Sequence, residues 1–147
     1  MREIKFRGLR IGSSEWVYGS LVNNLWVYSE NGLYPHEKVH EIITDQFSCD
    51  DYDDMQANQQ NVTVIPQSVG QYTGLKDLNG KEIFQGDILQ TTTDKAMAVS
   101  WSNKYASFVL NREGWAFSHW FGESCDPDQC VVIGNIHQNP ELLKGKS

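Results

Sequence analysis

The stretch YTGLKDLNGKEIFQGDIL, residues 72–89, contains three glycines at six-residue spacing, with turn-forming polar residues between apolar ones. Residues 77–80 (DLNG) predict a turn, because Asn and Gly accept positive φ angles. Residues 81–84 are then expected to run extended, and Gly86 permits a bend or a bulge. We expect Asp87 to hydrogen-bond the local backbone before the two apolar residues that follow enter the core.

The same stretch has an alternative interpretation as a phosphate-binding loop. Gly74, Gly80 and Lys81 resemble the glycines and lysine of such a loop. The spacing does not fit, because five residues separate the glycines instead of four. Glu82 also stands where a hydroxyl would hold magnesium. The sequence therefore favours a folding role for this stretch over phosphate chemistry.

Composition predicts a globular protein. The chain has 147 residues, of which 39% are hydrophobic and 12% aromatic, and it contains only four prolines. No apolar run has the length of a membrane span, and the polar start MREIKFRG is not a signal peptide, so we expect a cytoplasmic protein. Three cysteines, Cys49, Cys125 and Cys130, cannot form an even disulfide framework, and reduced thiols are expected.

Charge is unevenly distributed over this acidic chain, whose net charge is -7. The net charge disfavours nonspecific DNA binding, which needs clustered cations. The first ten residues are nevertheless basic, and a solvated strand face explains them most simply. Nucleic-acid binding is the alternative, with cations for the backbone and aromatic rings for base stacking; the residues concerned are Arg2, Lys5, Arg7 and Arg10 with Trp16 or Tyr18. Acids concentrated in residues 41–54 also suit self-association with the basic start.

The N-terminal part predicts an antiparallel meander followed by one short helix. Residues 3–11 alternate between apolar and basic side chains, and residues 15–22 and 25–29 read as two further strands separated by an Asn23-Asn24 turn. Pro35 and the apolar spacing after it predict a helix over residues 35–46.

The rest of the chain predicts a loop and a small barrel. Residues 48–61 are acidic, rich in Asn and Gln and without periodicity, which indicates a mobile linker. Short strands return from residue 62, and residues 139–143 predict a terminal helical turn. The predicted fold is α+β and mainly β, with a meander and helix in residues 1–47, the linker in 48–61, and an SH3-like barrel in 62–147, its strands ending near residue 136.

The segment HEKVH contains the H-E-x-x-H spacing of zinc peptidases. On a helix, His36 and His40 would share a face and reach one zinc ion, and Glu37 would act on the bound water. Third ligands could come only from Glu41, Asp45 or residues 50–54. The alternative is an amphipathic helix with these polar groups outward. The sequence favours this alternative, because the segment lies near the chain start on one short helix.

Other chemistry-bearing patterns are weak. Cys125 and Cys130 are separated by four residues and lie near His119 and His137, whereas structural zinc favours tighter, doubled cysteine pairs. The acidic CDDYDD run lacks the alternation of a calcium loop. No G-x-S-x-G elbow places a nucleophilic serine. The sequence therefore assigns no catalytic, cofactor-binding or metal-binding residue and no cofactor.

Four segments together resemble the YopX family of proteins encoded by bacteriophages and prophages of Firmicutes. They are MREIKFRG at the start, EWVYGSL (15–21), VGQYTGLKDLNGKEIFQGDIL (69–89) and VIGNIHQNPELL (132–143). The resemblance implies a mixed, β-dominated fold and homo-oligomers, and it supplies no catalytic set. His36, Glu37 and His40 lie outside the resembling segments.

The expected function is a non-enzymatic accessory or interaction module in the bacterial host cytoplasm. The expected partners are copies of the same chain and a host or phage protein, with no membrane contact. Exposed aromatic residues such as Tyr105, Trp115 or Trp120 favour protein contacts. Nucleic-acid binding and, behind it, zinc-dependent hydrolysis through HEKVH remain the alternatives.

Overall fold

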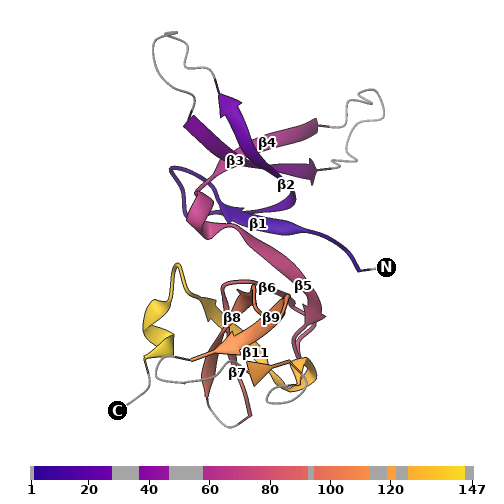
Figure 1. Cartoon of the computed structure of the whole chain (residues 1–147), viewed down its shortest axis with the longest axis vertical. Coiled ribbons are helices and arrows are strands. Elements are labelled where there is room, and N and C mark those ends of the chain that lie inside the picture. The colour runs from indigo at the N-terminus through magenta and orange to yellow at the C-terminus, as the bar shows by residue number, and fades with distance from the viewer. Residues whose placement is uncertain are drawn as a thin grey trace. The chain divides into compact units, whose positions relative to one another are not determined.

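The computed structural model describes residues 2–27, 37–46, 58–92, 95–112, 119–121 and 126–144. The chain divides into two compact units, one formed by Ile4–Val69 and the other by Met1–Glu3 together with Gly70–Ser147. Strands dominate both units, and the helices within the described ranges are short 3-10 helices (Figure 1). The mainly β class that the sequence predicts is confirmed, and the strands form antiparallel sheets.

The N-terminal unit contains four antiparallel strands in the spatial order β4-β3-β2-β1. Their bounds are β1 Phe6–Leu9, β2 Trp16–Val27, β3 Glu37–Gln46 and β4 Asn58–Val64, followed by the 3-10 helix η1 Pro66–Ser68. The two outer strands meet at one end. There the amide of Ile65 donates to the carbonyl of Leu9 at 2.8 Å, and the amide of Ile11 donates to the carbonyl of Thr63 at 3.2 Å. The sheet therefore curls on itself.

Two of the side chains that the structure describes in this curled sheet are fully buried, Ile42 and Val64. Ile42 pairs with Val62 within the β3–β4 ladder, and Val64 pairs with His40 at its end. Glycines allow the strands to approach closely. A Cβ atom on Gly8 would lie 2.8 Å from the Val64 Cβ, and one on Gly19 would overlap the backbone carbonyl of Ile43. Close backbone contact at these two glycines thus brings neighbouring strands of the unit together.

Two sequence predictions for this unit are wrong. The helix expected over residues 35–46 is the strand β3, in so far as the structure describes it, with β2 on one side and β4 on the other. The turn expected at Asn23-Asn24 does not form, because β2 continues to Val27 and accommodates the two asparagines as an irregularity in its register with β3. The predicted three-strand meander is therefore not confirmed.

Strand β4 also departs from the prediction. Residues 62–64 were expected to begin the C-terminal barrel, but they pair with His40, Glu41 and Ile42 in the N-terminal unit. Residues 58–61, expected at the end of a mobile linker, form the first half of the same strand. The remainder of the predicted linker, residues 48–57, lies outside the described residues.

The C-terminal unit consists of a hairpin and a five-stranded antiparallel sheet. The hairpin pairs β5 Gly70–Lys76 with β6 Glu82–Phe84, and the sheet has the order β10-β9-β8-β7-β11. The sheet strands are β7 Asp87–Gln90, β8 Ala96–Ser102, β9 Ser107–Asn111, β10 His119–Trp120 and β11 Val131–Asn135. Within the described residues this sheet is open, so the SH3-like barrel is not confirmed. The predicted terminal helical turn is confirmed as η3 Pro140–Leu143.

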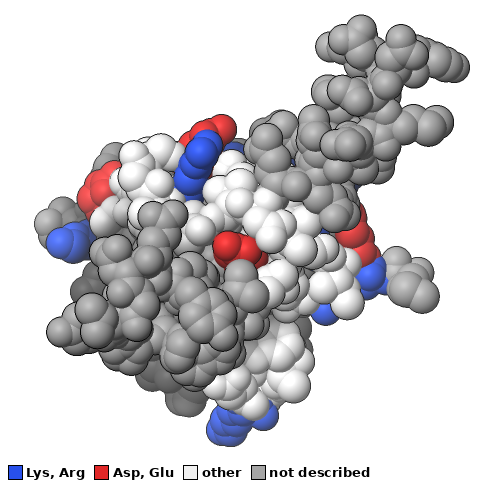
Figure 2. Space-filling model, turned by 90° about the horizontal axis from the view of Figure 1, so that it is seen from above, with Lys and Arg blue, Asp and Glu red and all other residues white. Residues whose placement is uncertain are grey.

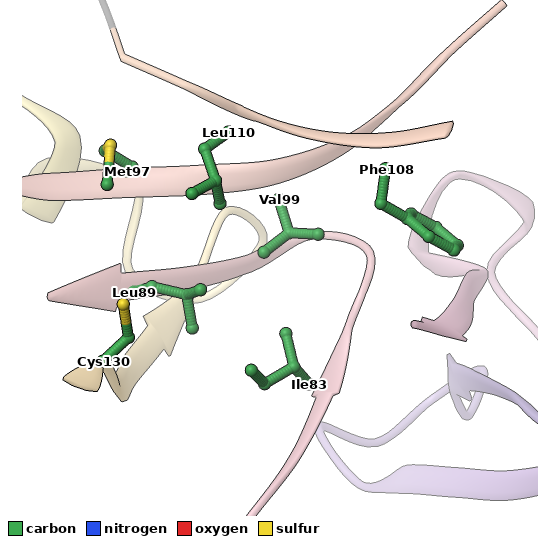
Figure 3. Close-up of a cluster of buried hydrophobic side chains, with 7 residues drawn as sticks. All are labelled: Ile83, Leu89, Met97, Val99, Phe108, Leu110 and Cys130. Atoms are coloured by element: carbon green, nitrogen blue, oxygen red, sulfur yellow. The ribbon is translucent and has the colours of Figure 1, made fainter. Parts of the chain in front are cut away.

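Side chains from four strands and one loop form the core of this unit (Figure 3). The cluster is made of Ile83, Leu89, Met97, Val99, Phe108, Leu110 and Cys130. Cys130 is fully buried and is disulfide-bonded, so the expectation of reduced thiols is wrong for this residue. The other two cysteines lie outside the described residues.

Candidate functional site

The HEKVH segment does not have the geometry that a helical zinc site requires. Glu37 and His40 lie in β3, and His36 lies outside the described residues. In a strand, two residues four positions apart are separated by about 13 Å, because each residue advances the chain by about 3.3 Å. The described part of the chain contains no group of three His, Cys, Asp or Glu residues that could hold a metal ion.

His40 and Glu41 instead face opposite sides of the curled sheet, because they are adjacent in a strand. His40 pairs with Val64 and Glu41 with Thr63. The Nδ1 atom of His40 and the Oε2 atom of Glu41 are each buried without a hydrogen-bond partner among the described residues. Asp45, another candidate ligand, also lies in β3, whereas residues 50–54 lie outside the described ranges.

The basic residues at the chain start do not form one solvent-facing patch. Arg7 is 5% exposed, and its guanidinium lies 4.3 Å from the centre of the Trp16 ring. Arg10 is exposed and pairs with Glu15 at 3.9 Å. Arg2 belongs to the C-terminal unit, where its side chain lies against Gly74, and Lys5 is half-buried.

The described surface agrees with this placement. On the face drawn in Figure 2, the described lysines and arginines are scattered among acidic and neutral residues. Tyr18 is 45% exposed, but the Trp16 ring is engaged by Arg7. Within the N-terminal unit, Arg7 and Trp16 of the predicted nucleic-acid interface therefore contact each other, and Arg7 is buried.

Asp77 holds together the turn at the centre of the stretch 72–89. The carboxylate is 5% exposed. Its Oδ1 accepts the amides of Asn79 and Lys81, both at 2.9 Å, and its Oδ2 accepts the amide of Val132 at 3.0 Å. Gly80 has a φ of 77°, as the predicted turn requires. One carboxylate thus closes the hairpin turn and ties it to β11, so the predicted turn is confirmed.

Asp87 has the role predicted for it in the next turn. Its Oδ2 accepts the amide of Phe84 at 2.8 Å, and the carboxylate is 1% exposed. Gly86 turns the chain with a φ of 91° between these residues, and Ile88 and Leu89 are fully buried. This buried carboxylate therefore bonds to the local backbone as the sequence predicts.

Asn135 is a further turn-holding residue that the sequence reasoning missed. Its Oδ1 accepts the amides of His137 and Gln138 at 3.1 and 2.9 Å, and the residue is 7% exposed. A Cβ on the neighbouring Gly134 would lie 2.6 Å from the Oδ1 of Asn139. The Gly-Asn dipeptide just before a Pro-started helical turn was a usable signal, because Asn side chains bond to amides two and three residues ahead.

The described part of the segment between Cys125 and Cys130 agrees with a loop that leads into a strand. Cys125 lies outside the described residues, and Cys130 follows the 3-10 helix η2 Pro127–Gln129 directly before β11. The side chain of His137 is exposed, and its amide is bonded to Asn135. Of His119 only the backbone is described, in β10.

The hairpin between β8 and β9 presents large aromatic side chains to solvent. Trp101 is 41% exposed and packs edge-on against Phe108, with 5.0 Å between ring centres. Tyr105 is 49% exposed and packs edge-on against Trp120 at 4.8 Å. Lys104 Nζ lies 5.1 Å from the centre of the Tyr105 ring. Exposure is thus confirmed for Tyr105, Trp120 is half-buried, and Trp115 lies outside the described residues.

Comparison with known proteins identifies the family. The model of the YopX protein family matches residues 5–144. The chain belongs to the YopX family. The matched range of this YopX-family chain includes the turns held by Asp77, Asp87 and Asn135.

One solved structure is similar to this YopX-family chain over nearly its whole length. Protein EF1440 from Enterococcus faecalis has 20% sequence identity and a TM-score of 0.48, covering 97% of this chain and 99% of its own. No curated protein matches the chain. Among the described residues, no helix is long and apolar enough to cross a membrane.

The N-terminal unit of this YopX-family chain also carries an open hollow of about 460 Å³. Its lining residues come from the end of β1 and from β4: Arg10, Ile11, Asn61, Val62 and Thr63. Ile11 is 56% exposed. The described lining of the hollow therefore includes one basic, two polar and two apolar residues beside the edge of a sheet.

Proposed function

We propose that this protein is a non-enzymatic accessory module, encoded by a phage or prophage, that works in the host cytoplasm as a homo-oligomer. Its self-contact is made by the aromatic surface of the β8–β9 hairpin, defined here as Trp101, Lys104, Tyr105 and Trp120. The observation that carries the proposal is the large exposed fraction of Trp101 and Tyr105 at the tip of a regular hairpin.

The chemistry of this aromatic surface suits a protein contact. Aromatic residues are enriched in protein interfaces because they bury a large area and lose little conformational freedom. Edge-on packing already restrains both exposed rings, Trp101 on Phe108 and Tyr105 on Trp120. Its only charged member is Lys104, which limits repulsion between copies of a chain with net charge -7.

A non-enzymatic role is supported by the contacts of two buried acidic residues in the stretch 72–89. Asp77 and Asp87 belong to the recognisable motif, and both are buried and hydrogen-bonded to backbone amides. A general base must reach a substrate proton, which these carboxylates do not.

Analytical ultracentrifugation of the full chain tests the proposal. We expect the wild-type protein to sediment as an oligomer and Tyr105→Ser to shift the population toward monomer by about tenfold in dissociation constant, as the loss of an interface anchor does. Tyr18→Ser is the matched control, because Tyr18 is 45% exposed and lies in the other unit. A monomeric wild type, or equal effects of the two substitutions, would contradict the proposed self-contact.

A further inference from the structure

The outer edge of β4 has a backbone that no described residue pairs with at Asn61. Odd-numbered residues of this strand turn their amide and carbonyl groups away from β3, because Thr63 accepts from Ile11 and Ile65 donates to Leu9 on that side. Asn61 turns its backbone toward the same edge by the two-residue alternation of a strand. None of the residues that the structure describes pairs with Asn61 on that side.

The edge is open only up to Thr63. Beyond that residue, Leu9, Arg10 and Ile11 occupy it through two backbone bonds and a bridge between Arg10 and Val64. The chain then leaves β4 in a turn, in which the Ser13 amide donates to the Arg10 carbonyl at 3.2 Å. The hollow opens at this divergence. A segment added along the edge from the Asn58 end must therefore stop at the hollow.

The residues that line the hollow determine which kind of chain end can bind there. The described lining residues include Arg10 and no Asp or Glu. Glu15 lies 3.9 Å from Arg10, but the two side chains are 69% and 57% exposed, so this ion pair is weak and leaves other guanidinium donors available. Asn61 and Thr63 also line the hollow and turn their backbone groups to this edge, and the exposed Ile11 adds an apolar residue. This chemistry favours a carboxylate with an apolar neighbour.

We propose that the outer edge of β4 binds the C-terminal end of an extended peptide. The peptide runs parallel to β4 from Asn58 toward Thr63, its backbone bonds to Asn61, and its terminal carboxylate binds Arg10 in the hollow. Strand addition and terminal-carboxylate capture are established modes of peptide recognition. A chain end fits because Leu9–Ile11 blocks continuation, and an N-terminal ammonium would meet the like charge of Arg10. The β4 strand of a second copy does not end there. It would meet Leu9–Ile11 whether it were added parallel or antiparallel to β4.

This binding site is independent of the self-contact proposed above. It lies in the N-terminal unit, whereas the aromatic surface lies in the C-terminal unit. A negative result for one proposal therefore does not contradict the other.

Nuclear magnetic resonance of the ¹⁵N-labelled full chain tests the site with two acetylated peptides of the sequence Thr-Val-Thr-Val. One has a free C-terminal carboxylate and the other a C-terminal amide. We expect amide shifts around Arg10 and in Asn61, Val62 and Thr63, and about tenfold weaker binding of the amidated peptide, because charge-assisted bonds to Arg10 are lost. No binding, or shifts confined to other residues, would overturn the proposal.

Three variants complete the test. Arg10→Gln is expected to bind both peptides equally weakly, and Arg2→Gln, an exposed arginine in the other unit, is expected to keep the tenfold preference. Ile11→Asp, at an exposed position, is expected to reject the carboxylate peptide by placing a like charge in the hollow. A carboxylate preference that survives Arg10→Gln would overturn the assignment. If the chain self-associates through β4 and thereby loses peptide binding, the edge binds a second copy instead of a peptide.

Discussion

In the C-terminal unit, seven buried side chains pack into one cluster and buried carboxylates hold the turns, whereas the N-terminal unit brings its strands together through Gly8 and Gly19. The first unit is therefore stabilised by apolar volume and by side-chain acceptors for backbone amides. The second depends on backbone contact around Ile42 and Val64.

This difference shows how stability is distributed in a chain with two units. A position in the C-terminal unit is sensitive when its side chain is removed, because an unfilled volume or an unsatisfied amide remains. A position in the N-terminal unit is sensitive when a side chain is added, because there is no space between the strands.

The largest effect is expected from Asp77→Ala. The substitution leaves the amides of Asn79, Lys81 and Val132 without their acceptor, so the free energy of unfolding of the C-terminal unit should fall by about 4 kcal/mol. Urea denaturation followed by circular dichroism measures the loss. Hydrogen exchange at these three amides shows whether it is local to this turn.

Asp77→Asn is the matched variant. Its remaining carbonyl can still accept two amides, but its NH₂ group then faces the Val132 amide, so we expect a loss of about 2 kcal/mol. If both variants unfold within about 0.5 kcal/mol of the wild type, the turn does not depend on this carboxylate.

An intermediate effect is expected from Gly19→Ala. The added Cβ would overlap the Ile43 carbonyl, so β2 and β3 must separate, and the free energy of unfolding of the N-terminal unit should fall by about 3 kcal/mol. Hydrogen exchange of the Ile42 and Ile43 amides reports on this separation.

Gly12→Ala measures the cost of backbone strain without the steric clash expected at Gly19. A Cβ on Gly12 has no neighbour within 4 Å, and only its φ of 81° disfavours alanine, which costs about 1 kcal/mol. Equal losses for the two glycine variants would mean that crowding between β2 and β3 contributes nothing.

The smallest effect is expected from Glu15→Gln. The ion pair with Arg10 is exposed and long at 3.9 Å, so its removal should change the free energy of unfolding by less than about 0.5 kcal/mol. Thermal unfolding at low and high salt measures it. A larger, salt-sensitive loss would show that surface charge, and not close backbone contact alone, stabilises the N-terminal unit.

Local features were predictable from the sequence where the side chain and its backbone partners lie within a few residues. The Asp77 turn and the Asp87 bond to Phe84 each span four residues or fewer, and both were expected. The terminal helical turn at Pro140 is equally local. The turn held by Asn135 is of the same kind and could have been predicted.

The strand β3 was not predictable in the same way. Val39, Ile42 and Ile43 fit a helical period, and Ile42 and Thr44, both buried, also fit the two-residue period of a strand. These residues form a strand and not a helix because β2 and β4 supply hydrogen bonds on the two sides of β3. The helix on which the zinc interpretation depended is a strand at Glu37 and His40, and His36 lies outside the described residues.

The open edge of β4 and the hollow beside it also had no sequence signal. Arg10 and Ile11 are about fifty residues from Asn61, Val62 and Thr63 in the chain, and they meet only because β1 and β4 join at one end. No short pattern in either segment indicates that meeting. A site of this kind can be found only in the folded chain.

By itself, the sequence 72–89 determined two turns, because a carboxylate finds the amides of its own neighbours whatever the rest of the chain does. The tertiary structure decided what each turn is attached to. It brought the Asp77 carboxylate to Val132, 55 residues away, and it placed β3, which includes Glu37 and His40, between β2 and β4. Bonds within a turn depend on local geometry alone, whereas strand pairing depends on which distant segments bury their apolar faces together.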